Sequence, residues 1–248
     1  MIRLAQSHLN LLEICPPQFQ RLYLEELNYP ITPEEEEKQT WGSQFHLLMQ
    51  QKELGLPINS IVEKDEELQK SLTALVAALS EMENETEIII KDAEHCRTLN
   101  LQGYLLTVIY DLLIIEKEKA QIFDWKTYLK PQSKVKLERN WQTRLYLYIL
   151  AETAEYLPEQ ISMTYWFVRL PNKPQSVTFT YNNSLHQQTH QDLSSLLTKL
   201  DGWLEDYLNE GIAFPHKPNC EESCPYYNGK YEPEKHWLTI EDIEEVAL

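Results

Sequence analysis

Two apolar, β-prone runs joined by a short charged link constrain the fold of this chain more than any other feature. Residues 105–115 and 121–127 are rich in Ile, Leu, Val and aromatic residues, and the link between them, residues 116–119, alternates Glu with Lys. This pattern is typical of a β-hairpin whose tip lies in the charged link. Both runs also contain charged residues, although burying an unpaired charge is costly.

The register of this hairpin brings two acids together. If Lys117 and Glu118 form a two-residue turn, the count back along both strands sets Asp111 opposite Asp124. Opposed side chains lie roughly 5 Å apart at Cβ, and two carboxylates that close repel each other unless a cation bridges them. Lys126 shares the face of Asp124, because side chains alternate along a strand. The sequence therefore predicts a divalent metal site with a lysine beside it; the alternative is an ordinary ion pair between Asp124 and Lys126.

Length and composition fit a soluble globular protein made of one large domain, or of one domain with a helical annex. The chain has 248 residues, of which 42% are hydrophobic and 25% charged. No apolar run approaches the roughly 18 residues that span a bilayer, and the amino terminus lacks the features of a secretory signal. Four scattered cysteines indicate reduced thiols or ligands. We therefore expect a cytoplasmic protein with no membrane partner.

The net charge of −17 counts against tight, non-specific binding of nucleic acid by this chain alone. It suggests weak affinity, a partner chain, or both. A locally basic stretch nevertheless follows the acidic pair, made up of Lys126, Lys130, Lys134, Lys136, Arg139 and Arg144.

The order of predicted elements indicates an α/β fold with an amino-terminal helical cap. A helix is predicted over 7–14, and a second one follows it and includes Phe19, Leu22, Tyr23 and Leu24. Further helices are predicted over 33–55, 65–79, 136–156 and 185–209. Strands are predicted over 87–91, 95–101, 104–115, 121–127, 161–170 and 176–181. One domain results, with a cap (1–84), an α/β catalytic core (85–210) and an irregular tail (211–248).

Three further residues could join the hairpin site. His46 follows Gly42 by one helical turn and is either a structural histidine or a third metal ligand, since imidazole joins carboxylates at Mn²⁺ and Mg²⁺ sites. Gln142 and Tyr146 project from one helix face. Tyr146 is either a core aromatic or, with Gln142, part of a pair that holds a phosphate or orients the lysine.

Taken in order, these motifs resemble those of the PD-(D/E)XK nuclease superfamily, in its RecB-type exonuclease branch. The matching residues are Gly42 with His46, Asp111, Asp124-Trp125-Lys126, and Gln142 with Tyr146. Residues 11–16 are similar to the opening helix of that branch, whereas Tyr110 stands where many relatives have arginine. The resemblance implies a restriction-endonuclease-like core, with a central mixed sheet flanked by helices.

The resemblance also implies roles for single residues. His46, Asp111, Asp124 and the main-chain carbonyl of Trp125 would bind Mg²⁺ or Mn²⁺, which polarises a phosphoryl oxygen and lowers the pKa of bound water. Lys126 would orient or activate the attacking water and stabilise charge on the phosphate. Nucleic-acid contacts are expected from Arg139, Gln142 and Tyr146.

The function implied is metal-dependent hydrolysis of DNA phosphodiester bonds, by an exonuclease or end-processing enzyme of repair, recombination or defence. No P-loop motif is present, so unwinding would need a helicase or another repair or defence protein as partner. The rival hypothesis is a non-catalytic subunit of a DNA-processing complex that keeps the fold, which the acidic charge favours. RNA as the substrate also stays open.

The cysteines match only part of a cluster-binding pattern. AddB-like and CRISPR-associated relatives that carry an iron–sulfur cluster use one early cysteine and three near the carboxyl end. Cys15, Cys220 and Cys224 resemble three of these, but a fourth late cysteine is missing. His216 or His236 could substitute in an iron–sulfur or zinc site. We expect instead a vestigial site without an iron–sulfur cluster.

Overall fold

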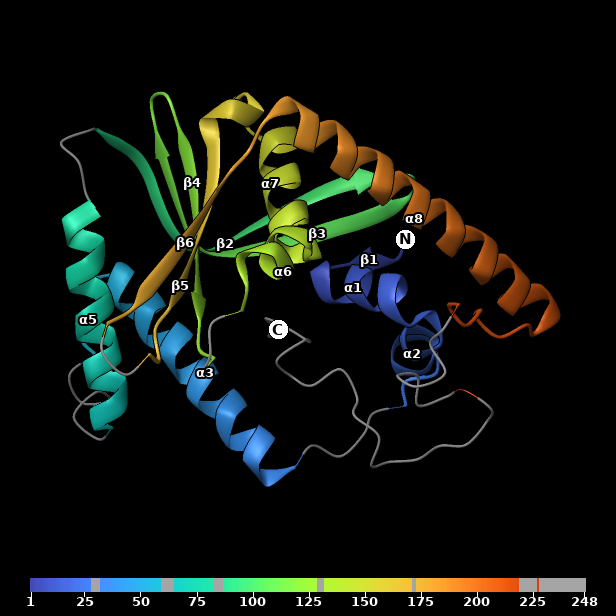
Figure 1. Cartoon of the computed structure of the whole chain (residues 1–248), viewed down its shortest axis with the longest axis horizontal. Coiled ribbons are helices and arrows are strands. Elements are labelled where there is room, and N and C mark those ends of the chain that lie inside the picture. Colours follow the sequence, from blue (N-terminus) through green and yellow to red (C-terminus); the bar gives the residue numbers. More distant parts are fainter. Residues whose placement is uncertain are drawn as a thin grey trace.

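The computed structural model describes residues 1–27, 32–58, 65–82, 87–128, 132–170, 173–218 and 227. These residues form one mixed six-stranded sheet with helices packed on both of its faces (Figure 1). The α/β fold class expected from the sequence is therefore confirmed.

The amino-terminal helices lie where the sequence predicts them. Strand β1 (Arg3–Leu4) precedes α1 (Gln6–Ile14), α2 (Pro16–Phe19) and the π-helical turn η1 (Gln20–Leu24). Helix α3 (Pro33–Glu53) begins with a capping box formed by Thr32 and Glu35. Asp65 directly precedes helix α5 (Glu66–Met82), and its side chain accepts hydrogen bonds from the first turn.

The sheet runs in the order β1-β3-β4-β5-β6, and β2 pairs with β3 as well. Its remaining strands are β2 (Ile88–Leu101), β3 (Tyr104–Glu116), β4 (Ala120–Lys126), β5 (Ile161–Phe167) and β6 (Gln175–Thr180). The pairs β1–β3 and β4–β5 are parallel, and the other pairs are antiparallel.

The predicted β3–β4 hairpin register is confirmed. Leu112 pairs with Phe123 and Ile115 with Ala120, and the Glu116 N–H donates to the Lys119 carbonyl at 2.9 Å. Lys117 and Glu118 therefore form the two-residue tip, as the count along the sequence requires.

Three elements differ from the prediction. The strands expected at 87–91 and 95–101 form one strand, β2. The helix expected over 136–156 is two helices, α6 (Lys134–Arg139) and α7 (Trp141–Thr153), because Asn140 is extended and its side chain accepts the Gln142 N–H at 2.7 Å. Strand β1 was not predicted at all. Its Leu4 pairs with β3 and is buried, so the first residues of the predicted cap are built into the core.

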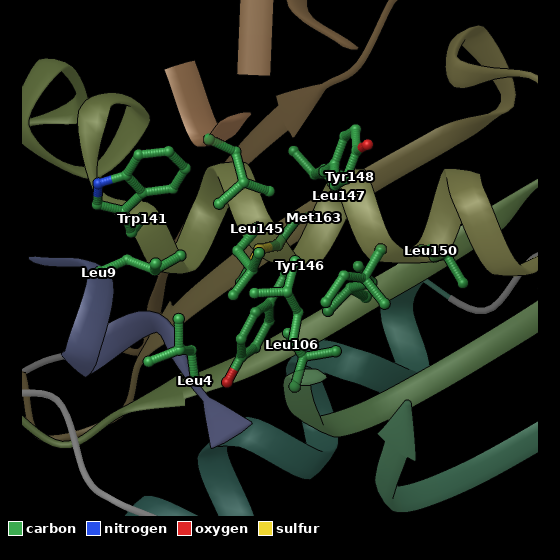
Figure 2. Close-up of a cluster of buried hydrophobic side chains, with 14 of the residues drawn as sticks. Leu4, Leu9, Leu106, Trp141, Leu145, Tyr146, Leu147, Tyr148, Leu150 and Met163 are labelled. Atoms are coloured by element: carbon green, nitrogen blue, oxygen red, sulfur yellow. The ribbon is translucent and has the colours of Figure 1, made fainter. Parts of the chain in front are cut away.

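Two hydrophobic clusters lie on the two sides of the sheet. The larger packs α1, α7 and the long helix α8 (Asn183–Glu210) against one face, and Figure 2 shows its leucines and aromatic rings around Met163. The smaller packs α3 and α5 against the other face. Within the described ranges, no helix is long and apolar enough to cross a membrane.

Candidate functional site

In the paired strands β2 and β3, the side chains change from one face of the sheet to the other at one pair of residues. Tyr110 packs in the larger cluster and Leu112 in the smaller one, although residues two apart on a regular strand share a face. The reversal falls at Asp111. Glu94 occupies the opposed position in β2, between the pairs Ala93–Leu112 and His95–Tyr110, and its φ is 53°. A non-glycine residue rarely adopts this left-handed conformation, which costs on the order of 1–3 kcal/mol.

Asp111 lies where β3 changes its neighbour. The paired stretch with β4 ends at Leu112, whereas the pairing with β1 covers Leu105 and Leu106. In between, Oδ2 of Asp111 accepts the main-chain N–H of Trp125 at 2.5 Å. The carboxylate therefore joins the two strands at the point where their ladder ends, and its second oxygen is turned toward α3.

Three side chains from separate elements converge on this point. Nδ1 of His46, on α3, lies 3.2 Å from Oδ1 of Asp111. Each of His46, Glu94 and Asp111 offers a ligand atom, and these atoms all lie within 4.8 Å of one another. One imidazole and two carboxylates form a donor set that suits Mg²⁺ or Mn²⁺. Helix α3 holds His46 here because neighbouring side chains anchor it to the sheet, namely Trp41, Phe45, Leu48 and Met49.

Glu94 is the residue that the sequence prediction missed. Gln102 and Gly103 form the turn between β2 and β3, and Leu101 pairs with Tyr104. The same residue count that set Asp111 opposite Asp124, started from this turn, reaches Glu94. This signal is present in the sequence, but the prediction of two strands, 87–91 and 95–101, leaves Glu94 between them.

Beside this group lies a buried cluster, the lysine cluster, of Asp124, Lys126 and Gln142. Nζ of Lys126 lies 3.0 Å from Oδ1 of Asp124 and donates to Oε1 of Gln142 at 2.6 Å. Nε2 of Gln142 donates to Oδ2 of Asp124 at 2.8 Å. All three residues are at most 5% exposed. The amide thus bridges the amine and the carboxylate, and it fixes both side chains at the carboxyl end of β4.

The structure brings together only part of the predicted metal set. His46 and Asp111 are in contact, but Asp124 is outside the group of close ligand atoms found among the described residues, because its carboxylate contacts Lys126 and Gln142. A cation shared by Asp111 and Asp124 therefore stays a prediction, as does a ligand role for the Trp125 carbonyl.

The family model of the PD-(D/E)XK nuclease superfamily matches residues 3–228, which include both groups of side chains. The chain belongs to this superfamily. A crystal structure of a proposed exonuclease from Eubacterium rectale is similar to this superfamily member, with a TM-score of 0.52 and 12% identity over 89% of this chain and 85% of that chain. At that identity the likeness shows the fold alone.

A crystal structure of SSO0001 also aligns with the nuclease-superfamily chain. Its TM-score is 0.38, and its identity is 12% over 79% of this chain and 76% of that chain, a likeness too low to support an argument. No curated protein matches the chain. The placement in the RecB-type branch stays a prediction.

The predicted nucleic-acid contacts of this superfamily member occupy different environments. Gln142 is buried in the lysine cluster, which favours the alternative in which it orients the lysine. Tyr146 lies among the buried side chains of the larger cluster (Figure 2), and its ring packs on Tyr110 at 5.3 Å between centroids. Burial raises the pKa of the Tyr110 phenol. Of the three predicted contacts, Arg139 is the one with an exposed side chain.

The basic stretch is only partly available for a polynucleotide. Lys136 and Arg139 are exposed on α6. Arg144, in contrast, pairs with Asp192 at 2.5 Å and lies over the ring of Trp141. Lys130 lies outside the described residues. Within the described part of this basic stretch, the exposed charges lie on α6, at Lys134, Lys136 and Arg139.

Of the three cysteines in the predicted vestigial site, only Cys15 lies within the described residues. Cys15 is buried between α1 and α2. Cys220, Cys224 and His236 lie outside the described residues. The tail returns toward Cys15, since Phe214 stacks on Phe19 and its N–H donates to Gln20 at 2.6 Å. A vestigial cluster site in this nuclease-superfamily protein stays a prediction.

Proposed function

We propose that this protein hydrolyses phosphodiester bonds of DNA with a bound Mg²⁺ or Mn²⁺ ion. One observation carries the proposal: the ligand atoms of His46, Glu94 and Asp111 converge within 4.8 Å. The lysine cluster lies beside them, linked through the hydrogen bond from the Trp125 main chain to Asp111. Nuclease-superfamily membership supports hydrolysis of nucleic acid as the reaction.

Each group has a chemical task in this proposal. His46, Glu94 and Asp111 hold the ion, and the family resemblance adds Asp124 and the Trp125 carbonyl as further ligands. A bound divalent ion supplies Lewis-acid polarisation of the phosphoryl oxygen and a more acidic water. Lys126 stabilises negative charge that develops on the phosphate, because an ammonium is a compact point charge. Gln142 keeps that ammonium in place, and Arg139 and Lys136 contact the phosphate backbone.

The preferred reaction is removal of nucleotides from DNA ends, as in an exonuclease of the RecB-type branch. The structural likeness to a proposed exonuclease supports this choice. The strongly acidic net charge favours weak intrinsic affinity, so a helicase or another repair or defence protein would deliver the substrate.

The test is cleavage of linear and circular DNA, single- and double-stranded, with Mn²⁺, Mg²⁺ or EDTA. Wild-type protein should degrade linear DNA only with metal, and Asp111→Asn and Lys126→Ala should reduce the rate by roughly 10³-fold or more. Asp206→Asn, at an exposed position of α8, makes the same chemical change away from the site and should leave cleavage unchanged.

Calorimetry with Mn²⁺ separates the rival function. A folded wild-type protein that neither cleaves DNA or RNA nor binds Mn²⁺ would be a non-catalytic subunit. Cleavage of RNA alone would keep the site and change the substrate.

A further inference from the structure

The proposed function does not use Tyr165, a buried side chain beneath the lysine cluster. Tyr165 lies on β5 as the register partner of Asp124 and is 0% exposed. The centre of its ring is 5.0 Å from Nζ of Lys126. A cation over an aromatic face is attracted by the ring quadrupole, and the attraction grows when water is excluded.

The ring of Tyr165 is held both at its hydroxyl group and through the packing of the ring itself. Oγ1 of Thr143 donates to the Leu137 carbonyl at 2.6 Å, which uses its one proton. In the 2.7 Å contact between the two hydroxyls, Tyr165 is therefore the donor and Thr143 the acceptor. The ring also packs against that of Phe179 in a T-shaped arrangement, with 5.9 Å between centroids. The ring is thus held from α7 and β6, and α6 fixes the hydroxyl of Thr143.

We infer that Tyr165 is a positioning residue for Lys126, which rests on the proposed role of this lysine in cleavage. Gln142 and Asp124 bind the ammonium through directed contacts at 2.6 and 3.0 Å. The face of Tyr165 supports the ammonium from a further direction, on the same side of the sheet. The rings of Tyr165 and of Tyr128, whose centre lies 5.7 Å from Nζ, thus add to the two directed contacts, and of the two rings that of Tyr165 is the nearer.

The test compares Tyr165→Phe, Tyr165→Leu and Tyr165→Met in the full chain. Phenylalanine keeps the ring, whereas leucine and methionine remove it, so either of the latter that folds is sufficient. With linear DNA and saturating metal, the ring-less variants should lose roughly tenfold in kcat with little change in KM. Tyr165→Phe should retain most of the wild-type kcat.

A second readout does not depend on cleavage. NMR of labelled lysine, assigned with Lys126→Met, should show the ε-methylene protons of Lys126 displaced by the ring current in wild type and Tyr165→Phe. The displacement should be reduced in the ring-less variants, where only the contribution of Tyr128, whose ring centre lies 5.7 Å from Nζ, remains. Tyr148→Leu removes another buried tyrosine of the same core, and should lower stability without changing kcat or the Lys126 signal.

The outcomes separate the two proposals. If wild type cleaves nothing, the proposed function fails and the NMR signal alone decides the role of Tyr165. Ring-less variants that keep the wild-type kcat, or a Lys126 signal that does not change with the ring, would overturn the inference.

Discussion

Glu94 and Asp111 occupy opposed positions of β2 and β3, and a ligand atom of each lies within 4.8 Å of the other. Like charges at that distance are unfavourable, and the left-handed backbone of Glu94 adds a further cost. Both costs fall at the same pair, where the strands exchange faces. A bound cation would offset the first cost, and the kinked backbone sets the direction of the Glu94 carboxylate.

The backbone cost at Glu94 can be measured by comparing glycine with alanine. Without metal, Glu94→Gly should be more stable than Glu94→Ala by about 1–2 kcal/mol, because glycine adopts positive φ without strain. Urea unfolding in EDTA gives the difference. The control compares Thr98→Gly with Thr98→Ala, elsewhere in β2. There the glycine variant should be less stable than the alanine variant by about 0.5–1 kcal/mol. Equal stabilities for the two Glu94 variants would contradict the strain.

Metal binding should depend on the Glu94 carboxylate as well. Wild-type protein at 100 times its Kd for Mn²⁺ should gain about 2.7 kcal/mol of unfolding free energy, and EDTA should reverse the gain. Both Glu94 variants should lose most of this increase, as should His46→Ala. Thermal unfolding across a Mn²⁺ titration measures it, and a full increase in either Glu94 variant would exclude that residue from the ligands.

A substitution at Gln142 tests whether its side-chain amide orients Lys126 or contacts the substrate. Gln142→Ala removes both hydrogen bonds of the lysine cluster and leaves the Asp124–Lys126 ion pair. We expect kcat to fall by roughly 10²-fold with KM little changed, since a misplaced group loses rate more than affinity. Single-turnover cleavage over a range of DNA concentrations separates the two constants. A raised KM at constant kcat would favour direct phosphate contact.

The buried charges of Asp124 and Lys126 should be coupled in stability. Lys126→Met or Asp124→Asn alone leaves an uncompensated buried group and should cost about 3–5 kcal/mol. The double variant should cost clearly less than the sum of the two single variants. Denaturant unfolding of the four proteins gives the coupling energy, and additive losses would show that the pair is not coupled. All three variants should be inactive.

His8 should make the fold sensitive to acid. Burial, aided by the charge of Arg3, lowers its pKa to about 4. The unfolded chain takes up a proton near pH 6.5, so the stability from neutral His8 is complete above pH 6.5 and is lost as pH falls toward 4. The loss is at most about 3 kcal/mol, and smaller because part of the ring is exposed.

The variant His8→Asn isolates this contribution. The wild-type advantage in unfolding free energy should shrink between pH 6.5 and pH 4.5 and stay constant between pH 7 and pH 8. Urea unfolding at these pH values measures it. An advantage that is independent of pH would show that His8 is protonated equally in both states.

The local sequence pattern is sufficient to predict the β3–β4 hairpin and most of the helices. The register of β3 and β4 follows from residue counting about the Lys117–Glu118 tip, because side chains alternate and the strands are adjacent in the chain. Capping chemistry likewise places the start of α3 at Thr32. The prediction misses the helix break at Asn140, because this cap interrupts an apolar pattern that is typical of one continuous helix.

The assembly of the site is a matter of tertiary structure. His46, Asp111 and Gln142 come from α3, β3 and α7, and helix packing on opposite faces of the sheet decides which of them meet. Residue preferences do not predict the left-handed backbone of Glu94, because no local preference favours positive φ for glutamate. The surrounding packing must enforce this conformation. Residue order thus defines which groups are available for chemistry. Which of them contact one another depends on long-range packing, whose free energy no local segment contains.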